Sequence, residues 1–237
     1  MIKLYSALLV FTFIPIILCG QRELSLQKDF AEKKIPQTNS DEWYLSNRAL
    51  DVYNVSADGG KLIIKKSKEV NHCGLKTPGG TFIGIDDGEF GGSLYFNTLD
   101  STKKPVFIKS GNIKFIFRYK SKIYFIESLA HMSLSYGALY ELDKKEDKFI
   151  YKKLLEFDDA PEAFTIYNNN ILIATHSGFC IIRNFKKEVV VIDTFWKNLY
   201  PNSVAAINNK NIFIGIRGGI VNLNPVNKEI RFYKKKE

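Results

Sequence analysis

The sequence predicts an all-β protein, and three observations carry that prediction. From Trp43 onward, short runs rich in Ile, Phe, Tyr and Val alternate with turn-forming clusters of Asn, Gly, Asp or Lys. Beyond the first twenty residues, no window of ten or more has a convincing helical period. A stretch near the C-terminus also repeats the stretch before it.

The chain begins with a segment typical of a signal peptide, expected over residues 1–20. Lys3 precedes an uncharged run over residues 4–18 that is too short to span a bilayer. The run ends in Ile-Ile-Leu followed by Cys19, which resembles the lipobox of bacterial lipoproteins, whose cysteine is lipidated. Leu18 departs from the small residue usual before that cysteine, so cleavage after Gly20 is the alternative. We therefore expect an exported protein: a periplasmic or cell-surface lipoprotein, or a secreted protein.

Composition predicts one folded domain after the leader. The chain is 45% hydrophobic and 25% charged, as in ordinary globular proteins. Residues 21–42 are polar and lack an apolar period, which predicts a tether or N-terminal arm before a domain over residues 43–237. The net charge of +9 is spread over lysine pairs at expected turns, often beside Asp or Glu, so a nucleic-acid partner is not expected. A membrane partner is expected only through a lipid at Cys19.

The internal repeat is the strongest evidence for the architecture. Residues 162–192 align without a gap on residues 203–233. The following pairs are identical: Ile166/Ile207, Asn168/Asn209, Asn170/Asn211, Ile171/Ile212, Ile173/Ile214, Gly178/Gly219, Lys187/Lys228 and Glu188/Glu229. The last copy predicts strands over 203–208, 211–216, 219–224 and 228–233, joined by short turns. Each copy is therefore expected to form a four-stranded antiparallel meander.

The second strand of each copy indicates how the meanders pack. Ile171-Leu172-Ile173-Ala174 is apolar on both faces, as is 212–215, which a strand sandwiched between two sheets requires. Such repeats resemble the blades of secreted propellers of the NHL, SMP-30 or two-component-regulator type. The resemblance implies a β-propeller of about five four-stranded blades, one incomplete and holding strands over 50–55 and 61–66. It implies no activity, because propellers host enzymes and binding platforms alike.

Familiar catalytic and metal motifs are absent, and the acidic glycine-rich segment over 79–92 is the nearest to a site. Asp86, Asp87 and Glu89 are oxygen ligands of the kind calcium accepts, but the EF-hand spacing is missing and an acidic hairpin turn is the alternative. No cofactor is predicted otherwise. Cys73 and Cys180 are expected to be small packed residues rather than a disulfide.

Meander topology predicts which residues share one ligand-binding face. The turn between strands two and three lies at the same end as the link to the next blade, so their side chains are expected to gather there. A long loop over 129–136 is expected to carry His131 to this face. The candidate ligand-binding residues are Asp86, Asp87, Glu89, His131, Asp158, Glu162, His176, Trp196, Tyr200 and Arg217. In the alternative interpretation, Trp196 plugs a gap between blades and the acids cap turns.

Two functional classes follow from these observations. The first is a noncatalytic binding platform that recognises a protein, peptide or glycan through this face. The second is a small-molecule lyase or hydrolase that uses a metal and a histidine or carboxylate base. The first is favoured, because no sequence motif supports the second and the expected inner strands carry apolar residues such as Phe164 and Ala205 at their centres.

Overall fold

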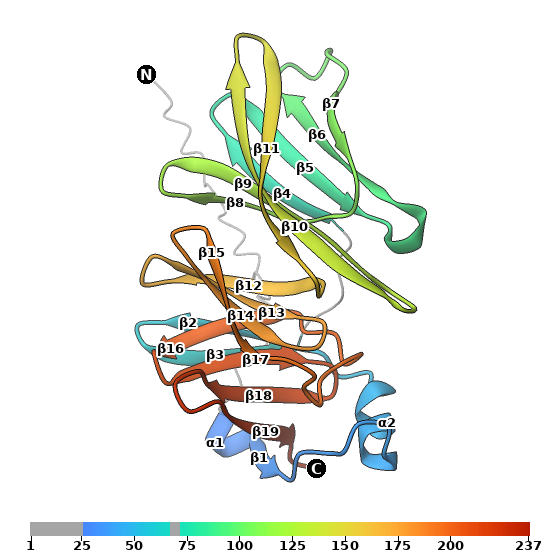
Figure 1. The fold of residues 1–237 in the computed structure, drawn as a ribbon, viewed down its shortest axis with the longest axis vertical. Helices are drawn as coiled ribbons and strands as arrows, with labels where there is room; N and C mark the ends of the chain where they lie inside the picture. The colour runs from blue at the N-terminus through green and yellow to red at the C-terminus, as the bar shows by residue number, and fades with distance from the viewer. Residues whose placement is uncertain (1–25, 67–71) are drawn as a thin grey trace, which may run out of the picture.

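The computed structural model describes residues 26–66 and 72–237, which form antiparallel sheets with few helical residues (Figure 1). The predicted signal peptide and Cys19 lie outside the described residues. Four successive segments each form a meander in which every strand pairs with the next along the chain. The predicted all-β class and the four-stranded unit are therefore confirmed.

The four meanders have closely similar layouts. The first contains β4 (His72–Thr77), β5 (Gly80–Asp86), β6 (Gly92–Thr98) and β7 (Val106–Ser110), with the 3-10 helix η1 (Gly88–Phe90) after β5. The second contains β8 (Ile113–Tyr119), β9 (Lys122–His131), β10 (Leu134–Lys145) and β11 (Lys148–Phe157). The third contains β12 (Pro161–Tyr167), β13 (Asn170–Thr175), β14 (Phe179–Arg183) and β15 (Lys186–Val191). The fourth contains β16 (Ser203–Asn208), β17 (Asn211–Ile216), β18 (Gly219–Asn224) and β19 (Glu229–Lys235).

A hairpin and an N-terminal segment complete the described fold. The hairpin consists of β2 (Tyr53–Asp58) and β3 (Lys61–Lys66), which form a two-stranded sheet where the sequence predicted an incomplete unit. The N-terminal segment consists of α1 (Leu26–Asp29), β1 (Phe30–Lys33) and α2 (Asp41–Asn47).

The repeat reappears as equivalent packing in β13 and β17. Ile173 lies opposite Cys180 on β14, and Ile214 lies opposite Val221 on β18, so the second and third strands pair in the same register in both copies. Ile173 and Ile214 are both fully buried, as their apolar surroundings in the sequence predicted.

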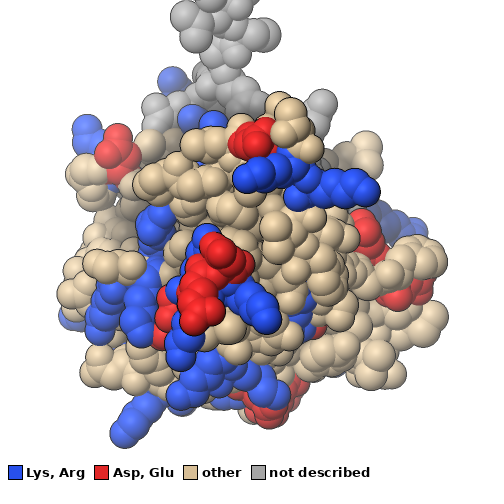
Figure 2. Space-filling view, turned by 90° about the horizontal axis from the view of Figure 1, so that it is seen from above, with Lys and Arg blue, Asp and Glu red and all other residues tan. Residues whose placement is uncertain are grey.

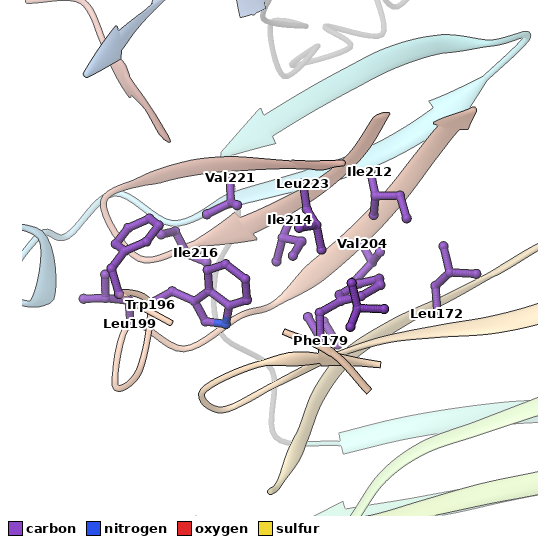
Figure 3. Packing of buried hydrophobic residues seen from close by; sticks show 14 of the residues in the cluster. Leu172, Phe179, Trp196, Leu199, Val204, Ile212, Ile214, Ile216, Val221 and Leu223 are labelled. Carbon is purple, nitrogen blue, oxygen red and sulfur yellow. The ribbon is translucent and has the colours of Figure 1, made fainter. Parts of the chain in front are cut away.

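Strand β13 is buried on both faces because it lies between two sheets. Ile171 and Ile173 pack toward the β8–β11 sheet, in a cluster with Phe117 and Tyr124. Leu172 on the opposite face packs toward the β16–β19 sheet, in the cluster drawn in Figure 3. The alternation of side chains along a strand therefore supplies two cores at once, which explains the absence of polar residues from the centre of β13.

The sheets form an open stack within the described residues. Separate buried clusters join β4–β7 to β8–β11, β8–β11 to β12–β15, β12–β15 to β16–β19, and β16–β19 to the β2–β3 hairpin. Among the described residues, no buried cluster joins that hairpin back to the β4–β7 sheet. In Figure 1 the β4–β7 sheet is uppermost, followed downward by the β8–β11 and β12–β15 sheets and then by the β16–β19 sheet.

Part of the segment predicted as a polar tether belongs to the folded domain. Strand β1 pairs with β19 and makes the last sheet five-stranded. Phe30 is only 2% exposed and packs edge-on against Tyr53 of β2. This strand could not be predicted from its sequence, because β1 has four residues and its one buried side chain makes no recognisable period.

The described residues contain two cysteines and a few short helices. Cys73 and Cys180 are free thiols, as predicted, and burial raises the pKa of the Cys180 thiol to about 12. No helix in the described ranges is long and apolar enough to cross a bilayer.

Candidate functional site

A cleft of about 610 Å³ lies where the β4–β7, β8–β11 and β12–β15 sheets approach one another. Its lining includes Asp86 and Asp87 after β5, Lys114 on β8 and Glu162 on β12. Phe90 of η1, residues 128–130 of β9 and Tyr200 complete the walls. The cleft therefore combines charged groups, two aromatic rings and a strand backbone from separate parts of the chain.

Lys114 connects the three sheets at the floor of this cleft. Its ammonium lies 3.0 Å from Glu162 Oε2 and 3.4 Å from Asp86 Oδ2. Glu162 is 7% exposed, so its carboxylate requires a partner of opposite charge. Burial by itself disfavours the Lys114 ammonium, but the charges of Glu162 and Asp86 outweigh that effect, and the pKa of Lys114 lies above its usual range.

His176 contacts Glu162 at the carboxylate oxygen that does not pair with Lys114. Its Nδ1 lies 3.8 Å from Glu162 Oε1, which is too long for a hydrogen bond but close enough for charge attraction. Its Nε2 lies 2.7 Å from Asn198 Oδ1, which fixes the ring. Attraction to Glu162 outweighs the opposing effect of burial, so the pKa of His176 is raised above its usual range.

The wall formed by the link between β15 and β16 is aromatic and cationic. The guanidinium of Arg217 lies 4.3 Å from the centre of the Tyr200 ring, and it donates to the backbone oxygen of Asn47 in α2. Tyr200 also meets the ring of His176 edge-on. Arg217 thus fixes a half-exposed tyrosine at the cleft, since a cation over a ring face is attracted to it.

An ion pair joins η1 to the end of β9. His131 Nε2 lies 2.8 Å from Glu89 Oε2, and both side chains are partly exposed. Nearby, Asp159 accepts hydrogen bonds from the backbone and hydroxyl of Ser177 and from the hydroxyl of Ser135. These contacts fix the loops around the cleft.

Most of the predicted face therefore comes together. Asp86, Asp87, Glu162 and Tyr200 line the cleft, His176 and Arg217 contact lining residues, and the Glu89–His131 pair stands beside them.

The prediction for Trp196 is wrong. Its ring is 0% exposed and lies in the core among Phe179, Leu199 and Ile216, as Figure 3 shows. Its indole nitrogen donates to the backbone oxygen of Thr175 at 3.4 Å. Burying this large ring between two sheets stabilises the fold more than exposing it at a face would, and no ligand can reach it here.

The structure places Asp158 outside the cleft. Its side chain is 98% exposed, does not line the cleft and pairs with Lys187. The adjacent Asp159 is the residue that holds the loops at this position. Successive residues of an extended link point to opposite sides, so a one-residue difference decides which aspartate faces the site.

The predicted long loop over 129–136 is instead a tight hairpin. β9 continues to His131 and β10 begins at Leu134, leaving two residues for the turn. Met132, in the turn, has a positive φ of 53°. Ser135 lies within the predicted loop, but it pairs with Ala130 across the hairpin.

Lys114 was the main residue that sequence reasoning missed. A signal was present, because Lys114 interrupts the apolar run Ile113-Lys114-Phe115-Ile116-Phe117 of an inner strand. A lysine at such a position needs buried carboxylates nearby. Glu162 on β12 supplies one, and it is likewise a charged residue on an inner strand.

The predicted calcium ligands are not gathered into one cluster in the part of the chain that the structure describes. Within residues 26–66 and 72–237, no three His, Cys, Asp or Glu side chains are placed to hold a metal ion. The ammonium of Lys114 lies between the carboxylates of Asp86 and Glu162, in the position that a cation would need. Glu89, the third predicted calcium ligand, pairs with His131.

The surface charges outside the cleft are mixed. Figure 2 shows the end of the molecule that is uppermost in Figure 1, where lysine and arginine side chains surround acidic ones. The hairpin between β10 and β11, with the sequence Lys144-Lys145-Glu146-Asp147-Lys148, is of this mixed kind. On this end, the positive charge of the chain is interspersed with carboxylates.

Comparison with known proteins adds no relative: no family model matches the chain, and no curated protein is significantly similar to it. What the fold and the site define is an all-β protein of stacked four-stranded sheets with a charged cleft at the junction of three of them.

Proposed function

We propose that this protein is an exported, noncatalytic binding module whose ligand occupies the cleft above Lys114. The observation that carries the proposal is the ion-paired lysine itself. Placing Lys114 between Asp86 and Glu162 at a junction of three sheets costs desolvation of three charged groups. Apolar residues at these positions would stabilise the stack at least as well, so the charged set is better explained by recognition of a polar ligand.

We further propose that the four meanders and the β2–β3 hairpin are blades of an open β-propeller. The 41-residue offset between repeat copies, the four-stranded units and the face-to-face packing support this assignment. In this arrangement the cleft occupies one mouth, where loops on a rigid scaffold bind ligands. The ligand class is a protein, peptide or glycan, and the localisation is the periplasm, the cell surface or the medium.

The lyase or hydrolase alternative has weaker support. His176 and Glu162 are a histidine and a carboxylate of the kind that act as bases, but His176 does not line the cleft, and the Glu162 carboxylate is already paired with the Lys114 ammonium. A general base must approach the proton it removes within hydrogen-bond distance.

The test is to apply the exported wild-type protein to glycan and peptide arrays beside Lys114→Met. Lys210→Met, in an exposed turn of the fourth sheet, is the matched control because it removes the same charge away from the cleft. We expect wild type and Lys210→Met to bind the same array members and Lys114→Met to lose them. Equal binding by all three proteins, or binding by none, would count against the proposal.

A further inference from the structure

The end of β9 at the cleft has no hydrogen-bonded strand on one of its two edges among the described residues. Strand β8 pairs with β9 only from Tyr119 back to Ile113, which lies opposite Glu127. On its other side β9 stays paired with β10 as far as His131. Residues 128–130 therefore belong to a strand that is paired on one side only, and all three line the cleft.

The orientation of the backbone groups follows from the hairpin. His131 and Leu134 close a two-residue turn, so alternate residues of β9 bond to β10, and Ser128 and Ala130 point the other way. The amide of Ser128 confirms this, because it donates to Asn112 O just beyond the start of β8 at 3.0 Å. The Ser128 carbonyl and both backbone groups of Ala130 come next, and the described residues supply no partner for them.

Two outer strands of the molecule, β11 and β15, carry several charged residues. β11 carries Lys148, Lys152, Lys153 and Glu156, and β15 carries Lys186, Lys187 and Glu188. Charged side chains on an outer strand are a usual defence against pairing with another chain. The edge of β9 at the cleft has only Ser128, Leu129 and Ala130 before His131. An uncharged strand edge inside a cleft favours pairing with an extended segment.

The walls facing this edge indicate the charge of that segment. The residues lining the cleft include three carboxylates, of Asp86, Asp87 and Glu162, but only one ammonium, that of Lys114. Phe90 is 87% exposed at the same wall, which is unusual for a phenylalanine and suits an apolar or cationic side chain. The excess of negative charge in a chain of net charge +9 favours a basic ligand.

We infer that the free edge of β9 binds an extended, basic peptide segment by β-strand addition. The inference rests on the proposed function and specifies its ligand. The segment takes the place beside β9 that β8 occupies further along the strand, where it donates to the Ser128 carbonyl and exchanges backbone hydrogen bonds with Ala130. A lysine or arginine of the segment meets Asp87, and a neighbouring side chain packs on Phe90.

The Glu89–His131 pair gives the groove a closure at one end. Because Glu89 belongs to η1 and His131 to β9, the pair ties together the two walls between which the segment lies.

The experiment begins with a random heptapeptide library displayed on phage and selected on the immobilised exported protein. We expect sequences with lysine or arginine between small or apolar residues to be enriched. One selected peptide is then synthesised unmodified, and again with N-methyl groups on one or on the other set of alternate amides. N-methylation on the edge that faces β9 removes donors and should weaken binding roughly tenfold or more.

Protein variants test the same contacts from the other side. Ala130→Pro removes the amide that faces the peptide without removing a bond to β10, so it should weaken binding to a similar extent. Phe90→Ala should weaken binding, whereas Phe107→Ala, which removes a ring that is 57% exposed on β7, should not. If Ala130→Pro does not fold, the N-methylated peptides decide the question.

The outcomes distinguish this inference from the proposed binding function on which it rests. If selection enriches no basic peptide, or if affinity is unchanged by methylation of both the one and the other set of alternate amides, strand addition is wrong. If a glycan or peptide binds with dependence on Lys114 but not on Ala130 or on peptide amides, the binding function stands and this inference fails. Binding that depends on neither Lys114 nor Ala130 overturns both.

Discussion

The ammonium of Lys114 lies 3.0 Å from the carboxylate of Glu162, and this contact joins two neighbouring sheets across the floor of the cleft. Asp86 brings a third sheet to the same ammonium. The three groups depend on one another, because removing one charge leaves another in a region largely withdrawn from water.

Replacing Lys114 by Met should therefore destabilise the protein. Losing one partner of a buried pair costs about 3–5 kcal/mol, and partial exposure of Lys114 reduces this to about 1–3 kcal/mol. The double variant Lys114→Met/Glu162→Gln should recover part of the loss, because the deeply buried charge is gone. Urea unfolding measures the free energy of unfolding of the single and the double variant. Lys122→Met, which breaks an exposed pair with Glu141, is the control and should cost less than about 1 kcal/mol. A loss for Lys114→Met no greater than for the control would contradict the role given to the pair.

The raised pKa of His176 predicts a pH-dependent contribution to stability. Because the folded pKa lies above the unfolded value near 6.5, protonated His176 stabilises the fold below that value, and the contribution is lost as pH rises through the folded pKa. The stability of wild type minus that of His176→Gln should therefore be greatest below about pH 6.5 and fall as the pH rises above that value. His131→Gln provides the comparison at a more exposed site. A difference between wild type and His176→Gln that stays constant with pH would exclude the attraction to Glu162.

Truncating Ile173 or Ile214 to Ala should cost about 2–5 kcal/mol in either case. Both side chains are fully buried and occupy equivalent positions on β13 and β17, so the two losses should also be similar. Ile166→Ala, at a side chain exposed to solvent on β12, should cost much less. Thermal and urea unfolding test this, and an unchanged melting temperature for either core variant would show that the repeat does not mark equivalent core positions.

Phe30→Ala should cost about 3–5 kcal/mol, although it lies in a segment whose sequence suggests a tether. The ring is buried against Tyr53, and its strand covers the edge of β19. Ile35→Ala, a more exposed residue of the same segment, is the matched control. If both variants unfold at the wild-type urea concentration, β1 does not contribute to the stability of the domain.

Cys19→Ser tests membrane attachment, which is proposed from the lipobox-like sequence. Wild type should fractionate with membranes and the variant should become soluble, because a lipid on Cys19 supplies the anchor. Mass spectrometry of the mature N-terminus is the second measurement. A soluble wild-type protein that begins at Gln21 would show ordinary signal cleavage instead.

Much of the local structure was predictable because it depends on neighbours in sequence. Strands β16, β17 and β18 have the bounds that the repeat and its turns predict. The apolar character of β13 on both faces correctly indicated a strand between two sheets, since a half-exposed strand would alternate. Topology also brought Asp86, Glu162 and Tyr200 to one cleft.

The tertiary structure decided features that depend on distant parts of the chain. The role of Lys114 depends on its pairing with Glu162 and Asp86, which lie on other sheets. Trp196 is buried because two sheets pack around it. β1 is a strand only because β19, near the other end of the chain, offers it an edge. The sequence by itself determined strands, turns and the repeat, because short-range hydrogen bonding and side-chain alternation set them. The order and openness of the stack, the charged floor of the cleft and the free edge of β9 depend on where strands end relative to their neighbours, which only the packed chain establishes.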